Sequence, residues 1–297
     1  MIVKMKQSKY FGFAPQAGLN INLNLCKRMK LMTYNILNGG QDNYNYDRLD
    51  KIISAIKSYN PDVLAVQEAM YFQQNKMKVF FRLENELNMR GFLAEANTGQ
   101  HVALFVSKKA IVEECEIDTI HFHHAMIKIK VRLENERSMT IISTHLCPYG
   151  GENRLKEVLY LTNNSRTNDY AIVMGDLNSV SKEEGNVDAI LDLPSHYQFR
   201  HFFPASKTKV DTRVIETLEL SGMIDLHKYF KKKDVDHSAP TKNEMHGKEF
   251  SKMRVDYIFG TPLVAKALLS CETLKNEITD YASDHYPIVS ELNINLK

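Results

Sequence analysis

Four apolar runs follow one another between residues 101 and 146, with little helical pattern between them. They read HVALFVS, AIVEECEI, HFHHAMIKIKVRL and SMTIISTHL. In the third run, apolar and basic residues alternate from Ile127 to Leu133. An alternation of period two is typical of an antiparallel strand with one face on a core and the other in water. The chain is therefore expected to contain an antiparallel sheet whose inner face is covered by another layer.

Helical patterns interrupt the strand runs on both sides of this block. From Tyr46, apolar residues recur on one helical face until Asn60-Pro61 ends the pattern. A second helix is predicted from Phe72 to Met89, stopped by Gly91, and a third over 152–161. Further strands are predicted in the runs LMTYNIL, DVLAVQE, YAIVMGD, VDYIF and YPIVSELNI. This order predicts mixed sheets packed face to face, with helices outside them.

Polar residues stand where six of these strand runs begin or end. They are Asn35, Glu68, His145, Asp176 with Asn178, Asp256, and Asp284 with His285. Strand ends gather at the edges of packed sheets, so these side chains are expected to converge in one cleft. Clustered carboxylates repel one another, and a bound divalent cation removes much of that cost. Carboxylate and amide oxygens without a thiolate cluster favour Mg²⁺, with Mn²⁺ as a substitute.

Several of these residues also fit a purely structural role. Asn35 fits a turn cap as well as it fits a direct contact, and Asp284 fits a hydrogen bond to backbone amides. The HFHH cluster resembles a metal site, but strand alternation favours a solvent-facing pair, His121 and His123. Arg154 and Glu157, on the helix after STHL, fit a surface pair three residues apart as well as they fit a functional role.

Six motifs occur together in one order: TYNIL, PDVLAVQEA, STHL, GDLNS, RVDYIF and SDHYP. With them the chain resembles the endonuclease/exonuclease/phosphatase superfamily, whose fold is like that of deoxyribonuclease I. The likeness runs from about Leu31 to the C-terminus and leaves the stretch from Asn178 to Arg254 largely unmatched. It implies a four-layer α/β sandwich, with two central mixed, mainly antiparallel sheets flanked by helices. We expect a single domain over 29–297, preceded by an arm over 1–28 that is poorly ordered or lies outside the domain.

The resemblance also implies a role for each motif residue. Glu68 would be the principal metal ligand, and Asn35 and Asp284 would support the metal. His285 would act as general base or polarise the phosphate, with Asp256 orienting its ring. Asp176 would position or deprotonate the attacking water. Asn178 and His145 would bind the phosphate oxygens, and His145 would also donate to the leaving group. Such a site hydrolyses a phosphodiester by in-line attack of water.

Nucleic acid is the first substrate hypothesis, for an endonuclease or an exonuclease. The run HKYFKKKD interleaves lysines with aromatic residues, as nucleic-acid grooves do, so Lys231 and Lys232 are candidate substrate contacts. A basic strand face at 128–132 also favours nucleic acid. A solvated helix end explains the lysine run HKYFKKKD as well as a nucleic-acid contact does. A phosphatase or a phospholipid phosphodiesterase is the alternative, which an exposed hydrophobic loop within 181–250 would favour. A binding module without catalysis is a third, weaker hypothesis, because no motif residue is missing.

Subfamily differences narrow this choice. His145 stands where apurinic endonucleases of the exonuclease III type carry a tyrosine, and the chain has no tryptophan, which argues against abasic-site repair. RVDYIF also lacks the WCDRI run of inositol polyphosphate 5-phosphatases.

Cysteine usage and the first residues bear on the compartment. Four scattered cysteines without a CxxC pair favour reduced thiols and a cytoplasmic location. No apolar run approaches the roughly 20 residues that span a bilayer, and the N-terminus lacks the apolar core of a signal peptide. A net charge of +2 neither demands nor excludes a polyanionic partner, and nothing implies a protein partner.

Overall fold

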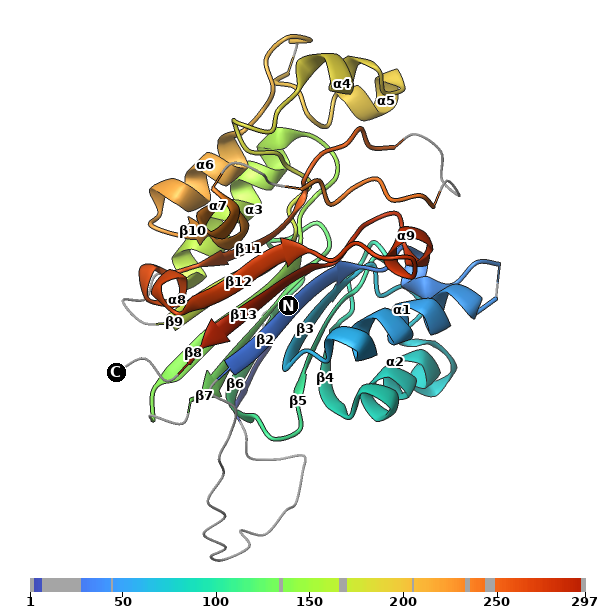
Figure 1. Ribbon diagram of the computed structural model, residues 1–297, viewed down its shortest axis with the longest axis vertical. Helices are drawn as coiled ribbons and strands as arrows, with labels where there is room; N and C mark the ends of the chain where they lie inside the picture. The colour runs from blue at the N-terminus through green and yellow to red at the C-terminus, as the bar shows by residue number, and fades with distance from the viewer. Residues whose placement is uncertain are drawn as a thin grey trace, which may run out of the picture.

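The computed structural model describes residues 3–6, 28–43, 45–133, 136–165, 170–204, 206–232, 236–243 and 249–294. Two β-sheets lie face to face at the centre of this part of the chain, and helices lie outside them (Figure 1). The predicted four-layer α/β sandwich is confirmed.

The first sheet has seven strands, and its members come mainly from the middle of the chain. In spatial order they are β1 (Val3–Lys6), β6 (Ile111–Asp118), β7 (Ala125–Arg132), β8 (Ser138–His145), β9 (Tyr170–Asp176), β11 (Asp256–Gly260) and β10 (Ile224–Asp225). Only β8 and β9 pair in parallel, and α3 (Gly151–Ser165) connects them. The strand β1 lies in the segment expected as an arm, where it pairs with β6; residues 7–27 lie outside the described residues.

The second sheet has six strands and joins the two ends of the domain. In spatial order they are β12 (Leu268–Thr273), β13 (Ile288–Asn293), β2 (Arg28–Asn35), β3 (Val63–Gln67), β5 (Val102–Ser107) and β4 (Met89–Ala94). Again one pair, β2 and β3, is parallel, and α1 (Asp47–Tyr59) connects it. Each sheet therefore contains one parallel pair whose strands are connected by a helix, and the strands of both parallel pairs end at the same edge.

Helices cover the outer face of each sheet. Apolar side chains of α1 and α2 (Gln74–Leu87) pack on the six-stranded sheet, and those of α3 and α6 (Arg213–Leu220) pack on the seven-stranded sheet. The shorter helices are α4 (Val187–Leu191), α5 (Ser195–Gln198), α7 (Leu226–Lys231), α8 (Pro262–Lys266) and α9 (Thr279–Ala282), with a 3-10 turn at Asn38–Gly40. In Figure 1, α4 and α5 lie at the top of the molecule.

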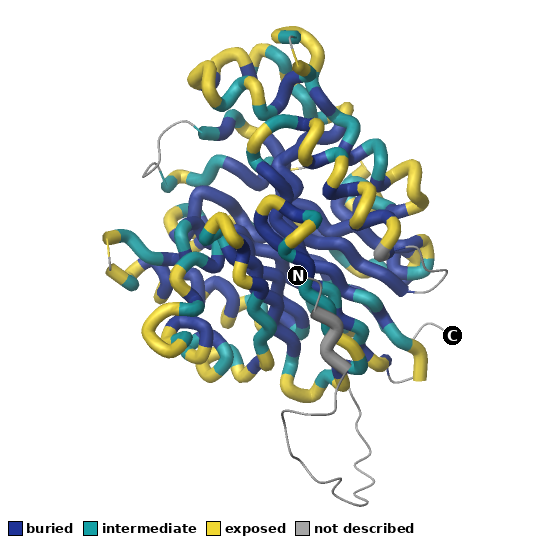
Figure 2. Tube along the Cα trace, turned by 180° about the vertical axis from the view of Figure 1, so that it is seen from behind, coloured by how far each residue is buried: buried dark blue, intermediate teal, exposed yellow. Residues whose placement is uncertain are grey.

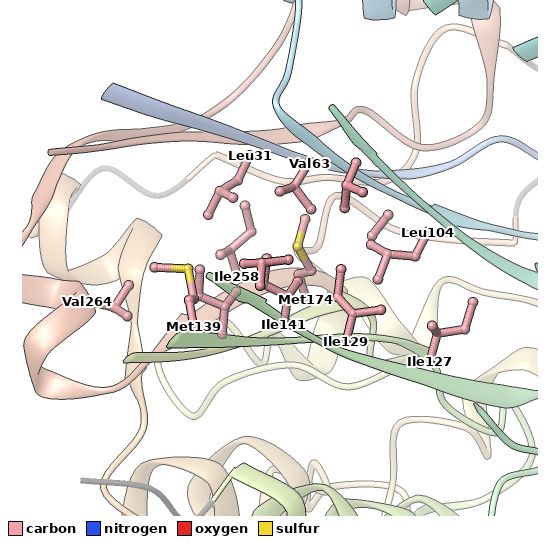
Figure 3. Packing of buried hydrophobic residues seen from close by; sticks show 14 of the residues in the cluster. Leu31, Val63, Leu104, Ile127, Ile129, Met139, Ile141, Met174, Ile258 and Val264 are labelled. Atoms are coloured by element: carbon pink, nitrogen blue, oxygen red, sulfur yellow. The ribbon is translucent and has the colours of Figure 1, made fainter. Parts of the chain in front are cut away.

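The main core lies between the two sheets (Figure 3). Leu31 and Val63 from the six-stranded sheet face Ile141 and Met174 from the seven-stranded sheet, and all four are 3% exposed or less. Figure 2 shows the same pattern along the whole trace, with buried strands inside and exposed turns outside. Because burying one such side chain contributes about 1.5–3 kcal/mol, this layer fixes how the two sheets face each other.

The predicted end of the second helix was wrong. Asn88, in a left-handed conformation, ends α2, and Gly91 lies inside β4. Glycine is required there by packing, because a Cβ on Gly91 would lie 2.4 Å from the ring of Phe80. Among the described residues, no helix combines the length and the apolar character needed to cross a membrane.

Candidate active site

The predicted site residues meet at one edge of the two sheets. In the first parallel pair, Asn35 at the end of β2 lies opposite Gln67, so Glu68 follows beside it. In the second pair, His145 at the end of β8 lies opposite Asp176 at the end of β9. A hydrogen bond of 3.1 Å from Asn35 Nδ2 to Asp176 Oδ2 connects the two sheets. The fold therefore brings together residues that are 141 positions apart in the chain.

The loop after β2 wraps around Glu68. The backbone N–H of Asn38 donates to Glu68 Oε2 over 3.0 Å, and the N–H of Gly39 donates to the Glu68 carbonyl over 2.8 Å. Gly39 has a φ of 67°, and a Cβ there would lie 2.1 Å from the carbonyl oxygen of Met70. Glu68 itself has a φ of 55°, which costs free energy in a side-chain-bearing residue and is typical of functional positions. The glycine of ILNGG thus allows the close approach that fixes this carboxylate.

His285 and Asp256 form a buried pair. His285 Nδ1 lies 2.7 Å from Asp256 Oδ2, and the two residues are 2% and 0% exposed. His285 Nε2 lies 3.9 Å from Asp176 Oδ2. Burial alone would lower the pKa of His285, but the carboxylates of Asp256, Asp284 and Asp176 raise it well above its usual value. The ring is held by one nitrogen and presents the other to the carboxylate cluster.

Asn35 bridges two carboxylates. Its Nδ2 donates to Glu68 Oε1 over 3.2 Å and to Asp176 Oδ2 over 3.1 Å, while its Oδ1 accepts from the backbone N–H of Leu37. Asn35 therefore both caps the turn and orients the acidic residues. Burial, reinforced by the charge of Asp284, raises the pKa of Glu68 to about 7.

Asn178 and His145 lie on the other side of Asp176. The backbone N–H of Asn178 donates to Asp176 Oδ1 over 2.8 Å, and its side-chain amide donates to the carbonyl of Leu146. His145 Nε2 lies 3.4 Å from Asp176 Oδ2, and its Nδ1 has no hydrogen-bond partner among the described residues. Burial lowers the pKa of His145 to about 3, so its ring is neutral at pH 7.

These side chains open into one cavity of about 480 Å³. Its lining includes Asn38, Glu68, His123, His124, His145, Tyr149, Asp176, Asn178, Arg200, Glu249, Phe250, Asp284 and His285. Asn35 and Asp256 stand behind this wall, where they contact residues that line it.

The sequence from residue 32 to residue 285 matches the model of the Endonuclease/Exonuclease/phosphatase family. The chain belongs to this family. Family members are phosphoester hydrolases that generally depend on a divalent metal ion, so the chain is a phosphoester hydrolase.

Solved structures share the fold at low sequence identity. An endonuclease/exonuclease/phosphatase from Bacteroides vulgatus has 19% identity and a TM-score of 0.63, covering 90% of this chain and 99% of its own. Truncated Caenorhabditis elegans TDP2 has 17% identity and a TM-score of 0.62, covering 89% of this chain and 97% of its own. D. rerio TDP2, complexed with single strand DNA product, has 16% identity and a TM-score of 0.61, covering 89% of this chain and 98% of its own. A comparison with curated protein sequences gave no match.

The donor set of this family member fits a hard divalent cation. Glu68, Asp176 and Asp284 face one cavity, and no cysteine lines it. One ligand atom each of Asp176, Asp256 and His285 also lie within 4.8 Å of one another. Clustered carboxylates with raised pKa values carry a repulsion that a cation would relieve. Asn35 turns its N–H groups, not its oxygen, toward the acids, so in this arrangement it positions ligands.

The structure adds residues that sequence reasoning missed. His124 is 3% exposed, stacks on His145 at a centroid distance of 4.4 Å and bonds Thr98 through Nδ1. The strand β7 begins only at Ala125, so the HFHH cluster lies in a bend before this strand. His123 and His124 both line the cavity. His121 and His123 were predicted to face solvent. His123 is exposed, whereas the ring of His121 forms a hydrogen bond with Asp118.

Arg200 and Glu249 form an ion pair at the cavity, and Phe250 packs edge-on against His285 at 5.0 Å. All three come from the stretch that matched no family motif. Only proximity in the fold assigns them to the cavity, because none of them belongs to one of the six motifs.

The surface-pair interpretation of Arg154 and Glu157 was wrong. Both are buried, at 1% and 3% exposure, and they do not bond each other. Glu157 accepts from the backbone N–H groups of His123 and Cys147, and Arg154 donates to the carbonyls of Cys147 and Arg200. They fix the loops that carry His123 and Arg200 to the cavity wall.

The two basic surfaces expected for nucleic acid lie elsewhere. Lys231 ends α7 and Lys232 is its C-cap, and neither lines the cavity. On the strand face at 128–132, Lys128 pairs with Glu116 and Arg132 with Glu113. The acidic residues of β6 thus balance the charge of that face.

Proposed function

We propose that this enzyme hydrolyses phosphodiester bonds in nucleic acid with Mg²⁺, for which Mn²⁺ substitutes. The observation that carries the proposal is that Glu68, Asp176, His145 and His285 open into the same cavity from strands of both sheets. The roles below are those that the motifs imply, with two changes: Asn35 orients the metal ligands instead of binding the cation, and Asp176 is added to them.

Glu68, Asp284 and Asp176 would hold the cation. When bound, it would neutralise charge on a phosphoryl oxygen and on the leaving oxygen. Asn35 orients two of these acids through its paired N–H donations, so the ligands are preorganised.

His285 presents Nε2 to the phosphate because Asp256 holds Nδ1 at 2.7 Å. A protonated ring donates to a phosphoryl oxygen and stabilises the charge that develops in the transition state. Asp176 lies within 4 Å of the imidazoles of His145 and His285, where it can orient the attacking water and take its proton. Asn178 and His145 supply further donors on the opposite side.

Nucleic acid is favoured by charge at the cavity and by one structural neighbour. Arg200 lines the cavity, where it pairs with Glu249, and the segment 195–213 carries four Lys or Arg residues against one acid. Arg213 is paired with Asp211 and Glu152, whereas Lys207 and Lys209 form no ion pair with the described residues. D. rerio TDP2, which shares the fold, is complexed with single strand DNA product. A polyanion matches such a surface.

One observation favours a phospholipid phosphodiesterase or phosphatase as the second candidate. Within 181–250, Leu191, Phe199 and Leu220 are 40%, 50% and 89% exposed. Exposed apolar side chains of this kind can contact a lipid surface.

A substrate panel tests the proposal. It contains plasmid, single-stranded DNA, RNA, a 5′-tyrosyl oligonucleotide, sphingomyelin and a phosphoinositide, each with Mg²⁺ and with EDTA. Wild-type protein is expected to cleave a nucleic-acid substrate only with Mg²⁺, and Glu68→Gln is expected to be inactive. Turnover of the lipids alone would replace the first candidate with the second, and turnover in EDTA would refute the metal-dependent mechanism.

A further inference from the structure

A second cavity of about 450 Å³ adjoins the one that holds the catalytic residues. Tyr149 lines both cavities. Phe199 lines the second cavity and its neighbour Arg200 lines the first, so one short segment contributes to the walls of both cavities. A substrate whose phosphate lies in the first cavity would place its adjoining group in the second.

Aromatic rings with open faces dominate the second cavity. Tyr149 and Phe199 are 53% and 50% exposed. Phe199 has no ring or cation contact with the other described residues, and the Tyr149 ring has a T-shaped contact with that of His123, at 5.4 Å between centroids and 87° between planes. Half-exposed rings beside a phosphate site are stacking platforms, because every nucleobase has an apolar face.

The rest of the lining suits the edges and backbone of a nucleotide. The side-chain N–H groups of Asn153 and Gln198 donate to backbone carbonyls, which leaves their amide oxygens as acceptors. With the hydroxyl groups of Ser195 and Ser206, they offer polar groups that a base edge can use and an acyl chain cannot. Lys207 also lines the cavity and forms no ion pair within the part of the chain that the structure describes. The mixture of rings, polar groups and a free cation fits a nucleotide better than a lipid tail.

The segment 195–213 has the composition of a single-strand groove. Its aromatic residues Tyr197, Phe199, Phe202 and Phe203 enclose Arg200 and are followed by Lys207, Lys209 and Arg213. Lys209 and Arg213 lie over the ring of Phe203, at 4.3 and 4.7 Å from its centroid. This is the pattern that the sequence suggested at Lys231 and Lys232, but here it borders the catalytic cavity.

We propose that Tyr149 and Phe199 stack an unpaired nucleobase of the nucleotide that flanks the scissile phosphate. The proposal rests on the nucleic-acid function above and adds a preference for single strands, because the faces of a paired base are already covered.

Kinetics with and without bases test the subsite. The substrates are a single-stranded oligonucleotide and an oligomer of equal length built from abasic tetrahydrofuran residues. Phe199→Ala is expected to lower kcat/KM about tenfold on the first and to change it by less than about twofold on the second. Tyr229→Ala is the matched control, because Tyr229 is 52% exposed on α7 and lines neither cavity. Equal losses on both substrates, or no loss on either, would overturn the assignment.

Stacking can also be observed without turnover. An oligonucleotide carrying 2-aminopurine, bound in EDTA, is expected to lose fluorescence with wild-type protein and with Tyr229→Ala. The quenching is expected to disappear in the Tyr149→Ala, Phe199→Ala double variant. Unchanged quenching in that double variant would contradict stacking on these rings.

The outcomes separate the two proposals. Oligonucleotide cleavage that Phe199→Ala leaves unchanged refutes the subsite and leaves the nuclease function standing. A wild-type protein that cleaves phospholipid vesicles and no oligonucleotide refutes both, and a loss of vesicle hydrolysis in Phe199→Ala would then assign the cavity to an acyl chain.

Discussion

Asn35→Asp would replace the amide that connects the two sheets by hydrogen bonds with a carboxylate that repels Glu68 and Asp176. The substitution keeps the size of the side chain but removes both N–H donations, to Glu68 over 3.2 Å and to Asp176 over 3.1 Å. Hydrogen bonds to charged groups contribute about 1.5–3 kcal/mol each, so their loss alone costs about 3–6 kcal/mol. Two like charges about 3.1 Å apart add roughly 5 kcal/mol at an effective dielectric constant near 20, until a proton binds.

The cost is expected to depend on pH and on the cation. In the folded variant, repulsion raises the pKa of the new carboxyl above its unfolded value. The folded state therefore binds more protons than the unfolded state, and stability falls as the pH rises from about 5 to about 8. We expect a loss in the free energy of unfolding of at least about 4 kcal/mol at pH 8 in EDTA, and about half of that at pH 5. Mg²⁺ should recover part of it, since four carboxylates attract a cation more strongly than three.

Urea denaturation measures these values. The chain has no tryptophan, so unfolding is followed by circular dichroism. Asn35→Ala is the control, because it removes the same hydrogen bonds without adding charge, and it should lose less stability between pH 5 and pH 8 than Asn35→Asp does. If Asn35→Asp proved as stable as wild type at pH 8 in EDTA, or no less stable than Asn35→Ala, the carboxylates would not converge as described.

Three further predictions follow from buried polar groups. Asp256→Asn removes the negative charge that orients His285 and favours its protonated ring, so kcat should fall about a thousandfold with little change in KM, and a fall below tenfold would contradict that role. Arg254→Ala leaves Asp225 buried without its partner, so the free energy of unfolding in urea should drop by about 3–5 kcal/mol, and an unchanged value would refute the pairing. Burial raises the pKa of Glu157 to about 7, so its contribution to stability falls as the pH rises from about 4.5 to 7. Glu157→Gln should flatten that slope in urea titrations at several pH values, and an unchanged slope would assign it to other groups.

The strand and motif pattern was sufficient to predict the fold. Alternation from Ile127 to Leu133 gave the half-buried strand β7, and Asn60 ends α1 as expected. Gly91 misled the prediction because glycine ends helices and also permits close packing inside a strand, and the sequence does not distinguish these uses.

The candidate site residues were predictable because each stands at a strand end or within a few residues of one. Residues of the wall were not, since Arg200 and Phe250 come from loops whose path depends on tertiary contacts. The burial of Arg154 and Glu157 was likewise not predictable from the sequence, because their hydrogen-bond partners are backbone groups of other segments. The basic and aromatic run at 227–234 drew attention by composition alone, whereas the run at 195–213 borders the cavity.

The turnover of His285→Ala on the best nucleic-acid substrate, at saturating Mg²⁺, tests the central claim most directly. His285 is 2% exposed, is oriented by Asp256 and faces the acidic cluster, so its removal takes away the donor to the phosphate. We predict a loss in kcat of about 10³-fold or more, with an unchanged circular dichroism spectrum. A loss of only a few-fold in a folded variant would mean that the acids and imidazoles gathered from the two sheets do not act together on the phosphoester.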